Sequence, residues 1–199
     1  MLNNLKENEI QVATRLINGG LSMAKKSMEQ ILQSPITIQK IDYSKDSSAP
    51  HRYEEATGTN VHLLKTGLMG DLKGSCYLIF TAKEVDKINK ACLPKQVLND
   101  DSDQAKMMKM GFLTEIDNMV AAAVITEFSN LLGLELFGMV PSLHIVDAAE
   151  VNDYLSTESE QFDTVIHFKA VFHGEELDIM PHFVWMVQKE FMNKIREIS

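Results

Sequence analysis

Apolar residues recur at the spacing of an α-helix through the middle of the chain, between Asp103 and Pro141. Because a helix turns by about 100° per residue, residues three, four and seven apart share one of its faces. The residues with this spacing are Phe112, Ile116, Val120, Ala123, Val124 and Leu131. The pattern predicts one long helix that ends near Leu132 and Gly133 and buries a single apolar stripe.

The opposite side of this predicted helix carries Glu115 and Asn118, which lie one turn apart. The residues around them on that side are mostly small: Gly111, Thr114, Ala122, Ile125 and Ser129. A solvated helix face is the ordinary interpretation of such a pair. Asn is unfavourable inside a helix, however, because its side chain competes for backbone hydrogen bonds. Since this side also lacks Lys and Arg, we expect an exposed docking surface that includes Ile125.

The chain before the long helix predicts a helix, a strand, a hairpin and a second helix. Helical spacing covers residues 4–33, and Gly19-Gly20 inside it indicates either a kink or a close packing contact. Pro35 ends that helix. The later elements are a strand at 36–43, a polar loop at 44–57, hairpin strands at 59–68 and 75–81, a helix at 82–93 and a linker at 94–102.

The chain after the long helix predicts similar elements in a similar order. They are a strand at 142–148 that Pro141 opens, a polar loop at 149–161, a strand of alternating apolar and polar residues at 162–173, a strand at 177–186 and a helix at 187–197. Pro181 lies inside the last of these strands. A proline cannot donate to a strand ladder, so it indicates an edge strand or a bulge.

Both halves therefore read helix, strand, loop, hairpin, helix. At an offset of 100 residues Asn18 pairs with Asn118, although the identity between the halves is slight. The pattern predicts one α+β domain over residues 1–199, made of two repeats at about 1–95 and 103–199. In that arrangement the two long helices lie side by side on one face of a shared antiparallel sheet.

Composition and charge narrow the function classes. The chain has 199 residues and a formal net charge of −9, which argues against a nucleic acid partner, since phosphate binding needs a basic surface. No apolar run reaches the roughly 18–20 residues that span a bilayer, so we expect no membrane insertion. The N-terminus is too polar for a secretory signal. Cys76 and Cys92 lack a framework spacing, so we expect free thiols and a cytoplasmic protein.

Other chemistries find no matching pattern. The six histidines lack zinc-site spacing, so we expect no metal held by this chain. The glycines at 67, 70 and 74 precede a strand rather than the Gly-Lys-Ser/Thr of a phosphate loop. No Gly-x-Ser-x-Gly or Cys/His nucleophile pattern is present. We interpret the methionines near the long helix as adaptable packing: Met107, Met108, Met110, Met119 and Met139.

Glu115, Asn118 and Pro141 together spell Glu-x-x-Asn, then 22 residues, then Pro. This pattern resembles the active-site signature of the CheC/CheX/FliY family of chemotaxis phosphatases, and the order of elements extends the resemblance over nearly the whole chain. The family pattern usually has Asp or Ser where this chain has Gly111, which bears on the level of activity. The resemblance implies a pseudo-twofold α+β fold, with two long helices on a central antiparallel sheet of about six strands.

The first half does not keep the signature. Asn18 is present, but Arg15 stands in place of the glutamate and Ile41 in place of the proline. A reversed charge removes the carboxylate that the signature uses. We therefore expect the first helix to be structural and the chain to have one functional site.

The resemblance implies a phosphatase that acts on the phosphoaspartate of a CheY-type response regulator. An amide can both donate and accept, so Asn118 would orient the attacking water. Glu115 would engage a lysine of the regulator, and Pro141 would set where the helix sits against the sheet. The partner, rather than this chain, would supply Mg²⁺, so no cofactor of its own is expected. The residues around the pair, Gly111, Thr114, Ala122 and Ile125, would contact the partner.

Two other interpretations remain open at this point. One is a catalytically weak adaptor that binds a response regulator or a CheD-like deamidase, which Gly111 favours. The other is a structural component of the flagellar switch, because switch proteins of the FliM and FliY kind share the fold.

Overall fold

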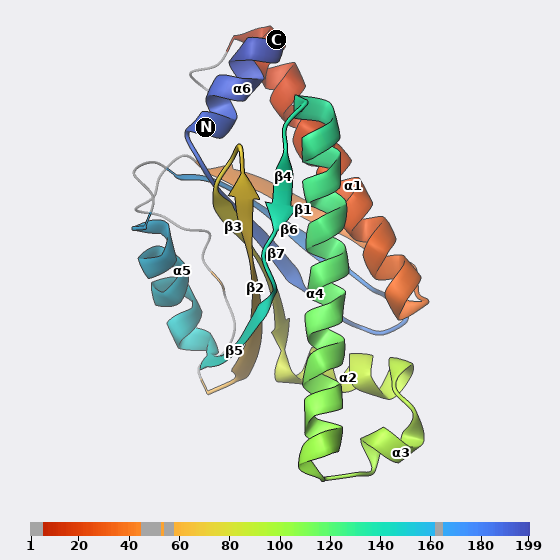
Figure 1. The fold of residues 1–199 in the computed structure, drawn as a ribbon. Helices are drawn as coiled ribbons and strands as arrows, with labels where there is room; N and C mark the ends of the chain where they lie inside the picture. Colours follow the sequence, from red (N-terminus) through yellow and green to blue (C-terminus); the bar gives the residue numbers. More distant parts are fainter. Residues whose placement is uncertain (1–5, 45–52, 54–57, 162–164) are drawn as a thin grey trace.

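Two long helices, α1 (Glu7–Leu32) and α4 (Asp103–Leu132), lie side by side on one face of an antiparallel sheet (Figure 1). The computed structural model describes residues 6–44, 53, 58–161 and 165–199. Within these residues the sheet has seven strands, one more than the six or so predicted. The strands are β1 (Thr37–Ser44), β2 (Asn60–Gly70), β3 (Gly74–Thr81), β4 (Leu136–Gly138), β5 (Ser142–Asp147), β6 (Val165–His173) and β7 (His182–Gln188). The α+β class and the arrangement of the long helices are as predicted.

The order of the strands is symmetrical between the halves. The sheet runs β1-β6-β7-β3-β2, and the far edge of β2 pairs with β5 along one part and with β4 along another. If β1, β2 and β3 are exchanged with β5, β6 and β7, this order reads the same from the opposite edge. The internal duplication stays a prediction, and such an order is what it would produce.

Close packing between α1 and α4 depends on the two glycines of α1. A Cβ atom on Gly20 would lie 2.8 Å from Phe128 Cε1 and 2.9 Å from Val124 Cγ1, and one on Gly19 would lie 2.9 Å from Glu127 Oε1. The helix continues through both residues from Glu7 to Leu32. Of the two predicted alternatives, the close contact is therefore correct. It brings the two helices together over the core.

The main core lies between these helices and the sheet. Phe168 and Trp185 stack there with ring centroids 5.8 Å apart, and Phe128 of α4 packs against both rings. The inward residues Phe168, Ala170 and Phe172 confirm the predicted alternation for the described part of β6. Residues 162–164, which the prediction included, lie outside the described residues.

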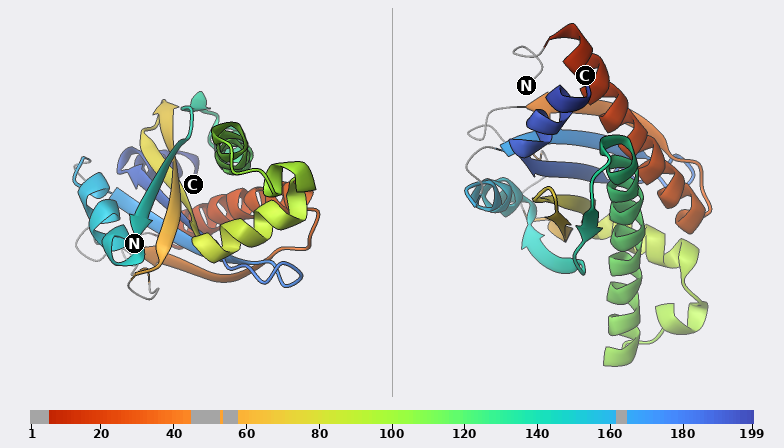
Figure 2. Two further views of the ribbon diagram at one scale, coloured as in Figure 1. Left: turned by 90° about the horizontal axis from the view of Figure 1, so that it is seen from below. Right: turned by 45° about the horizontal axis from the view of Figure 1, so that its top comes forward.

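The prediction of a polar loop at 149–161 is wrong, because helix α5 (Val151–Ser159) forms there after a short 3-10 turn, η2 (Ala148–Glu150). Ser, Asn and Asp favour loops in isolation. Here Val151 and Leu155, four residues apart, are buried in a second core on the other face of the sheet. Figure 2 shows α5 on the opposite side from α1 and α4. Burial of this apolar pair outweighs the weak helix propensity.

The strand predicted at 177–186 is also wrong in its position. Residues 175–178 form a turn closed by a bridge between Gly174 and Ile179, and β7 begins only at His182. Pro181 therefore precedes the strand, and its carbonyl accepts a hydrogen bond from Phe172 N at 3.0 Å. Because β7 lies between β6 and β3, the expected edge position is replaced by a central one.

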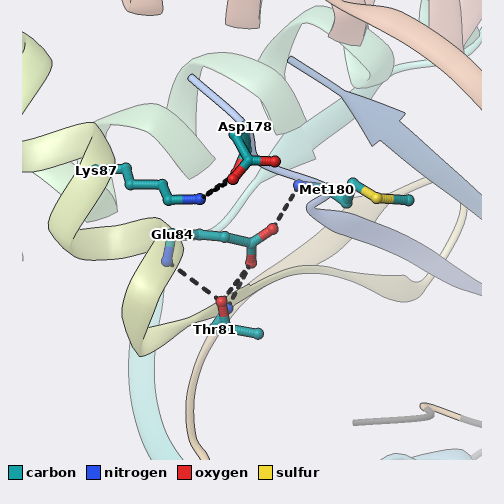
Figure 3. Close-up of polar contacts among 5 residues, drawn as sticks. All are labelled: Thr81, Glu84, Lys87, Asp178 and Met180. Carbon is teal, nitrogen blue, oxygen red and sulfur yellow. Dashed lines mark hydrogen bonds and ion pairs between the residues drawn. The ribbon is translucent and has the colours of Figure 1, made fainter. Parts of the chain in front are cut away.

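The remaining helices are α2 (Ala82–Cys92), α3 (Lys95–Leu98), which lies in the predicted linker, and α6 (Glu190–Ile198). Helix α2 connects the two halves (Figure 3). Glu84 accepts hydrogen bonds from Thr81 at the start of α2 and from Met180 N before β7. Lys87 forms an ion pair with Asp178, in the turn at 175–178 that precedes β7. The polar loop predicted at 44–57 lies almost entirely outside the described residues.

Candidate functional site

Helix α4 has clear start and stop signals in its sequence. Ser102 accepts a hydrogen bond from Ala105 N at 3.2 Å at the first turn, and Gly133 ends the helix with φ 64°. Between them one side of the helix is buried against α1 and the sheet, as the apolar stripe predicts. The buried set is wider than predicted and includes Leu113, Ala121, Ile125 and Phe128. The position of Glu115 and Asn118 on the exposed side follows from this burial.

A shallow groove of about 360 Å³ lies between the exposed side of α4 and the segment that joins β4 to β5. It brings together Glu115, Asn118 and Pro141, the three residues of the sequence signature. Its full lining is Gly111, Thr114, Glu115, Asn118, Gly138, Met139, Val140 and Pro141. Among the described residues, neither Glu115 nor Asn118 has a side-chain hydrogen bond or ion pair. Both groups are therefore available to an approaching molecule.

The second wall of the groove is held by β2. Met139 N donates a hydrogen bond to Gly67 O at 2.8 Å. The same glycine leaves room for the methionine, because a Cβ atom on Gly67 would lie 2.7 Å from Met139 Sδ. Strand β4, which pairs with the end of β2, was missed from the sequence because three residues carry too little pattern. It places the residues that lead to Pro141 opposite α4.

Of the four residues expected to contact a partner, Gly111 and Thr114 line the groove, while Ala122 is exposed on the same helix but outside it. The expectation for Ile125 is wrong. Its side chain is 4% exposed, because it packs against Gly138 of β4. The unpredicted strand β4 covers the face of the helix on which Ile125 lies.

Exposed apolar side chains lie in the groove and beside its helical wall. Val140 is 89% exposed and Met139 55%, and Met110 at the start of the helical wall is 41% exposed. Met107 and Met108 are exposed as well, so of the five methionines interpreted as packing residues only Met119 is half-buried. Exposed apolar side chains that lie together usually mark a surface that contacts another molecule.

Asp117 lies below the groove and was not recognised from the sequence. Its side chain is fully buried, and Oδ2 accepts a hydrogen bond from Thr66 Oγ1 of β2 at 2.7 Å. Oδ1 has no hydrogen-bond partner among the described residues. Burial raises the pKa of this carboxyl to about 7. The available signal was its place on the apolar side, four residues after Leu113 and four before Ala121.

Two other features bear on what the site can do. Within the residues that the structure describes, no group of three or more His, Cys, Asp and Glu side chains could hold a metal ion. In the same part of the chain, no helix is both long and apolar enough to cross a bilayer. The groups that the groove itself offers are the carboxylate of Glu115, the amide of Asn118 and an apolar border.

No protein-family model and no curated protein sequence matches this chain. Several solved structures have a similar fold. FliY from Thermotoga maritima has a TM-score of 0.64 at 16% identity, over 98% of this chain and 96% of that protein. CheX from Borrelia burgdorferi, in a complex with CheY, BeF3 and Mg²⁺, has a TM-score of 0.60 at 15% identity, over 87% and 97%. CheX from Desulfovibrio desulfuricans has a TM-score of 0.58 at 12% identity, over 87% and 99%.

These similarities agree with the resemblance of the sequence signature and with the pseudo-twofold arrangement of two long helices on one sheet. The chain therefore shares its fold with the CheX and FliY proteins.

Proposed function

We propose that this protein is a phosphatase that removes the phosphoryl group from the phosphoaspartate of a CheY-type response regulator. The observation that carries the proposal is the groove itself. Glu115 and Asn118 are exposed and one turn apart on one wall, without a hydrogen bond or ion pair to the part of the chain that the structure describes, and Pro141 lies on the other wall. Two exposed polar side chains that make no hydrogen bond or ion pair with the described residues are well suited to act on another molecule.

The chemistry asks little of this chain. A water oxygen attacks phosphorus, the bond between phosphorus and the aspartyl oxygen breaks, and the carboxylate leaves with the bonding electrons. Both water protons end on the inorganic phosphate, because a carboxylate needs no proton to leave. Asn118 would hold the water in line through its carbonyl and amide groups. Placement of a reactant is sufficient here, since the acyl phosphate is already labile.

The partner is expected to bring the rest of the site. Its Mg²⁺ would neutralise charge on the phosphoryl group, and Glu115 would pair with one of its lysines. The groove is shallow and bordered by exposed Met139 and Val140, which suits a protein surface better than an enclosed small molecule. The similarity in fold to a CheX that forms a complex with CheY favours a response regulator over other proteins.

The test is a time course of phosphate release. Response regulators from the same cell, labelled on the aspartyl phosphate, are mixed with the protein at increasing concentration. The expected result is faster loss of label from at least one regulator, which EDTA abolishes through the partner's metal. If the protein accelerates dephosphorylation of none of them, the proposal is wrong.

A catalytically weak adaptor is the second candidate, and Gly111 favours it. A Cβ atom there would meet nothing within 4 Å, so the Asp or Ser of the family pattern has room and yet is absent. An adaptor would bind the phosphorylated regulator without faster loss of phosphate, which the same time course separates from catalysis. A CheD-like partner stays a prediction. A structural role in the flagellar switch is kept as a third interpretation because of the similarity to FliY.

A further inference from the structure

Asp117 is a buried carboxyl group at a position where the fold accepts an apolar side chain. The matching residue of α1, 100 positions earlier, is Ile17, and both side chains are fully buried. The equivalent buried position of the other long helix thus holds no polar group. An ionisable group kept in a core without full hydrogen bonding costs free energy, and such groups occur most often at functional sites.

The Asp117 hydrogen bond joins α4 to a short segment of β2 that also holds the opposite wall of the groove. Thr66 donates to Asp117 Oδ2 at 2.7 Å, and its neighbour Gly67 accepts from Met139 N at 2.8 Å. The methyl group of Thr66 also lies 3.5 Å from the Cβ position of Gly138. Both walls of the groove are thus attached to two consecutive residues of one strand.

We infer that Asp117 is a positioning residue for the groove: its hydrogen bond with Thr66 sets the helical turn that carries Glu115 and Asn118 relative to the wall that carries Pro141. The inference rests on the proposed function where it concerns catalysis, and it stands independently where it concerns the geometry of the groove. Asp117 itself touches no reacting atom.

The surroundings of Asp117 make its contact with Thr66 sensitive to pH. Burial raises the pKa of Asp117 to about 7, so its charge changes near neutrality. The Thr66 hydroxyl faces it from β2, and the Cys76 thiol is near it on β3. Burial raises the pKa of Cys76, so this thiol stays neutral. The residues that α1 buries at the level of Ile17 are apolar or glycine.

The first test replaces both partners with apolar residues in Asp117→Ile/Thr66→Val, so that no polar group is left unpaired. The double variant is expected to fold with unchanged or higher thermal stability, while kcat for regulator dephosphorylation falls by about 10-fold and KM changes little. Thr66→Ser keeps the donor and is expected to retain wild-type kcat. A stable double variant with full kcat would overturn the inference, as would a large loss of kcat in Thr66→Ser.

The second test needs no enzymatic activity. The side-chain amide signals of Asn118 are followed by NMR as a function of pH, in the wild type and in Asp117→Asn. In the wild type they are expected to shift with a midpoint near the Asp117 pKa, and in the variant to stay constant through that range. If the wild type dephosphorylates no regulator, the proposed function fails and this titration alone decides the inference. If the Asn118 signals of the wild type do not shift through the pH range in which Asp117 titrates, the inference is overturned.

Discussion

Helices α1 and α4 solve the same packing problem with different chemistry. Over residues 11–22 and 111–122, buried, half-buried and exposed positions follow each other in the same order, position by position. The side chains nevertheless differ at the positions of α4 that line or support the groove. The position of α1 equivalent to Glu115 is occupied by Arg15, and the position equivalent to Asp117 is occupied by Ile17. The fold thus dictates which positions are exposed, whereas the choice of residue at them is free to carry function.

The segments that follow the two helices differ more than the helices do. Four residues separate α1 from β1, whereas nine separate α4 from β5, and these nine contain β4. The extra segment forms one wall of the groove beside Asn118. Ile41, the predicted counterpart of Pro141, instead pairs with Ala170 inside the sheet. An exposed asparagine on a long helix becomes a candidate site only where this second wall is present.

The largest effect on stability is expected from changing Asp117 and, as its control, Ile17 at the equivalent buried position of α1. The pKa of Asp117 is about 7 when folded and near 3.8 when unfolded, so the native state binds the proton more tightly. Its ionisation therefore lowers stability as pH rises from about 4 to 7. Relative to wild type, Asp117→Asn should gain about 4 kcal/mol in unfolding free energy between pH 4 and pH 8. Urea unfolding at each pH measures this difference.

Other groups titrate in the same pH range, but their contributions are the same in the wild type and in Asp117→Asn, so they cancel when the two unfolding free energies are subtracted. Burial lowers the pKa of His182 to about 3, which acts in the opposite direction between pH 3 and 6.5. The matched control is Ile17→Asp, which puts a carboxyl group into the buried position of α1. It should destabilise the protein by several kcal/mol at pH 8 and by less at pH 4. Equal stability changes at both pH values in both variants would contradict the assignment.

The second prediction compares the two exposed asparagines. Asn118→Ala should slow dephosphorylation by about 100-fold at saturating regulator, because the attacking water loses its placement. Binding of the regulator should change little. Asn18→Ala removes the same side chain from α1, where no β4 wall is present, and should leave the rate unchanged. A similar loss in both variants would show that α1 also carries a working site.

The third prediction compares the residues one turn earlier. Glu115→Ala should raise the regulator concentration needed for half-maximal rate by roughly 30-fold, which corresponds to about 2 kcal/mol for one lost charge pair at an interface. The maximal rate should change less. Arg15→Ala should alter neither quantity. The measurement is the rate of phosphate loss against regulator concentration, and a loss confined to the maximal rate would reassign Glu115 to the chemical step.

The smallest effect concerns the glycines of the two helices. Gly111 is exposed and has open space around its Cβ position, so Gly111→Ala should raise stability by about 1 kcal/mol through helix propensity. Thermal unfolding should then occur about 2–4 °C higher. Gly20→Ala would place its Cβ 2.8 Å from Phe128 and should lower stability instead. A higher melting temperature in both variants would mean that α1 and α4 are packed less closely than described.

The long periodic elements could be predicted from the sequence, and so could the three residues of the signature. Asp103 to Leu132 contains enough turns for helical spacing to be unmistakable, and that spacing alone puts Glu115 and Asn118 on the exposed side. The hairpin of β2 and β3 was equally clear. In each case the information lies within one continuous segment of chain.

What the sequence could not provide depends on contacts between distant segments. Ile125 is buried only because β4 covers it, and α5 forms because Val151 and Leu155 find apolar residues on the far face of the sheet. Pro181 was assigned to a strand because the sequence does not show that the turn extends to residue 178 and that β7 begins only at His182. The role of Asp117 depends on Thr66, which is 51 residues away. Local periodicity carries none of these pairings.

The central pairing of β3 with β7 and the pairing of β1 with β6 have a consequence for how the chain folds. Thr37 pairs with His173, and Gly74 pairs with Val187, so neither half can complete the sheet alone. During synthesis β1 cannot form its ladder with β6 until the chain has been made as far as residue 173. Contacts of such long sequence separation slow folding and prolong the exposure of apolar strands. We therefore expect this protein to refold slowly and to depend on chaperones more than a helical protein of its length.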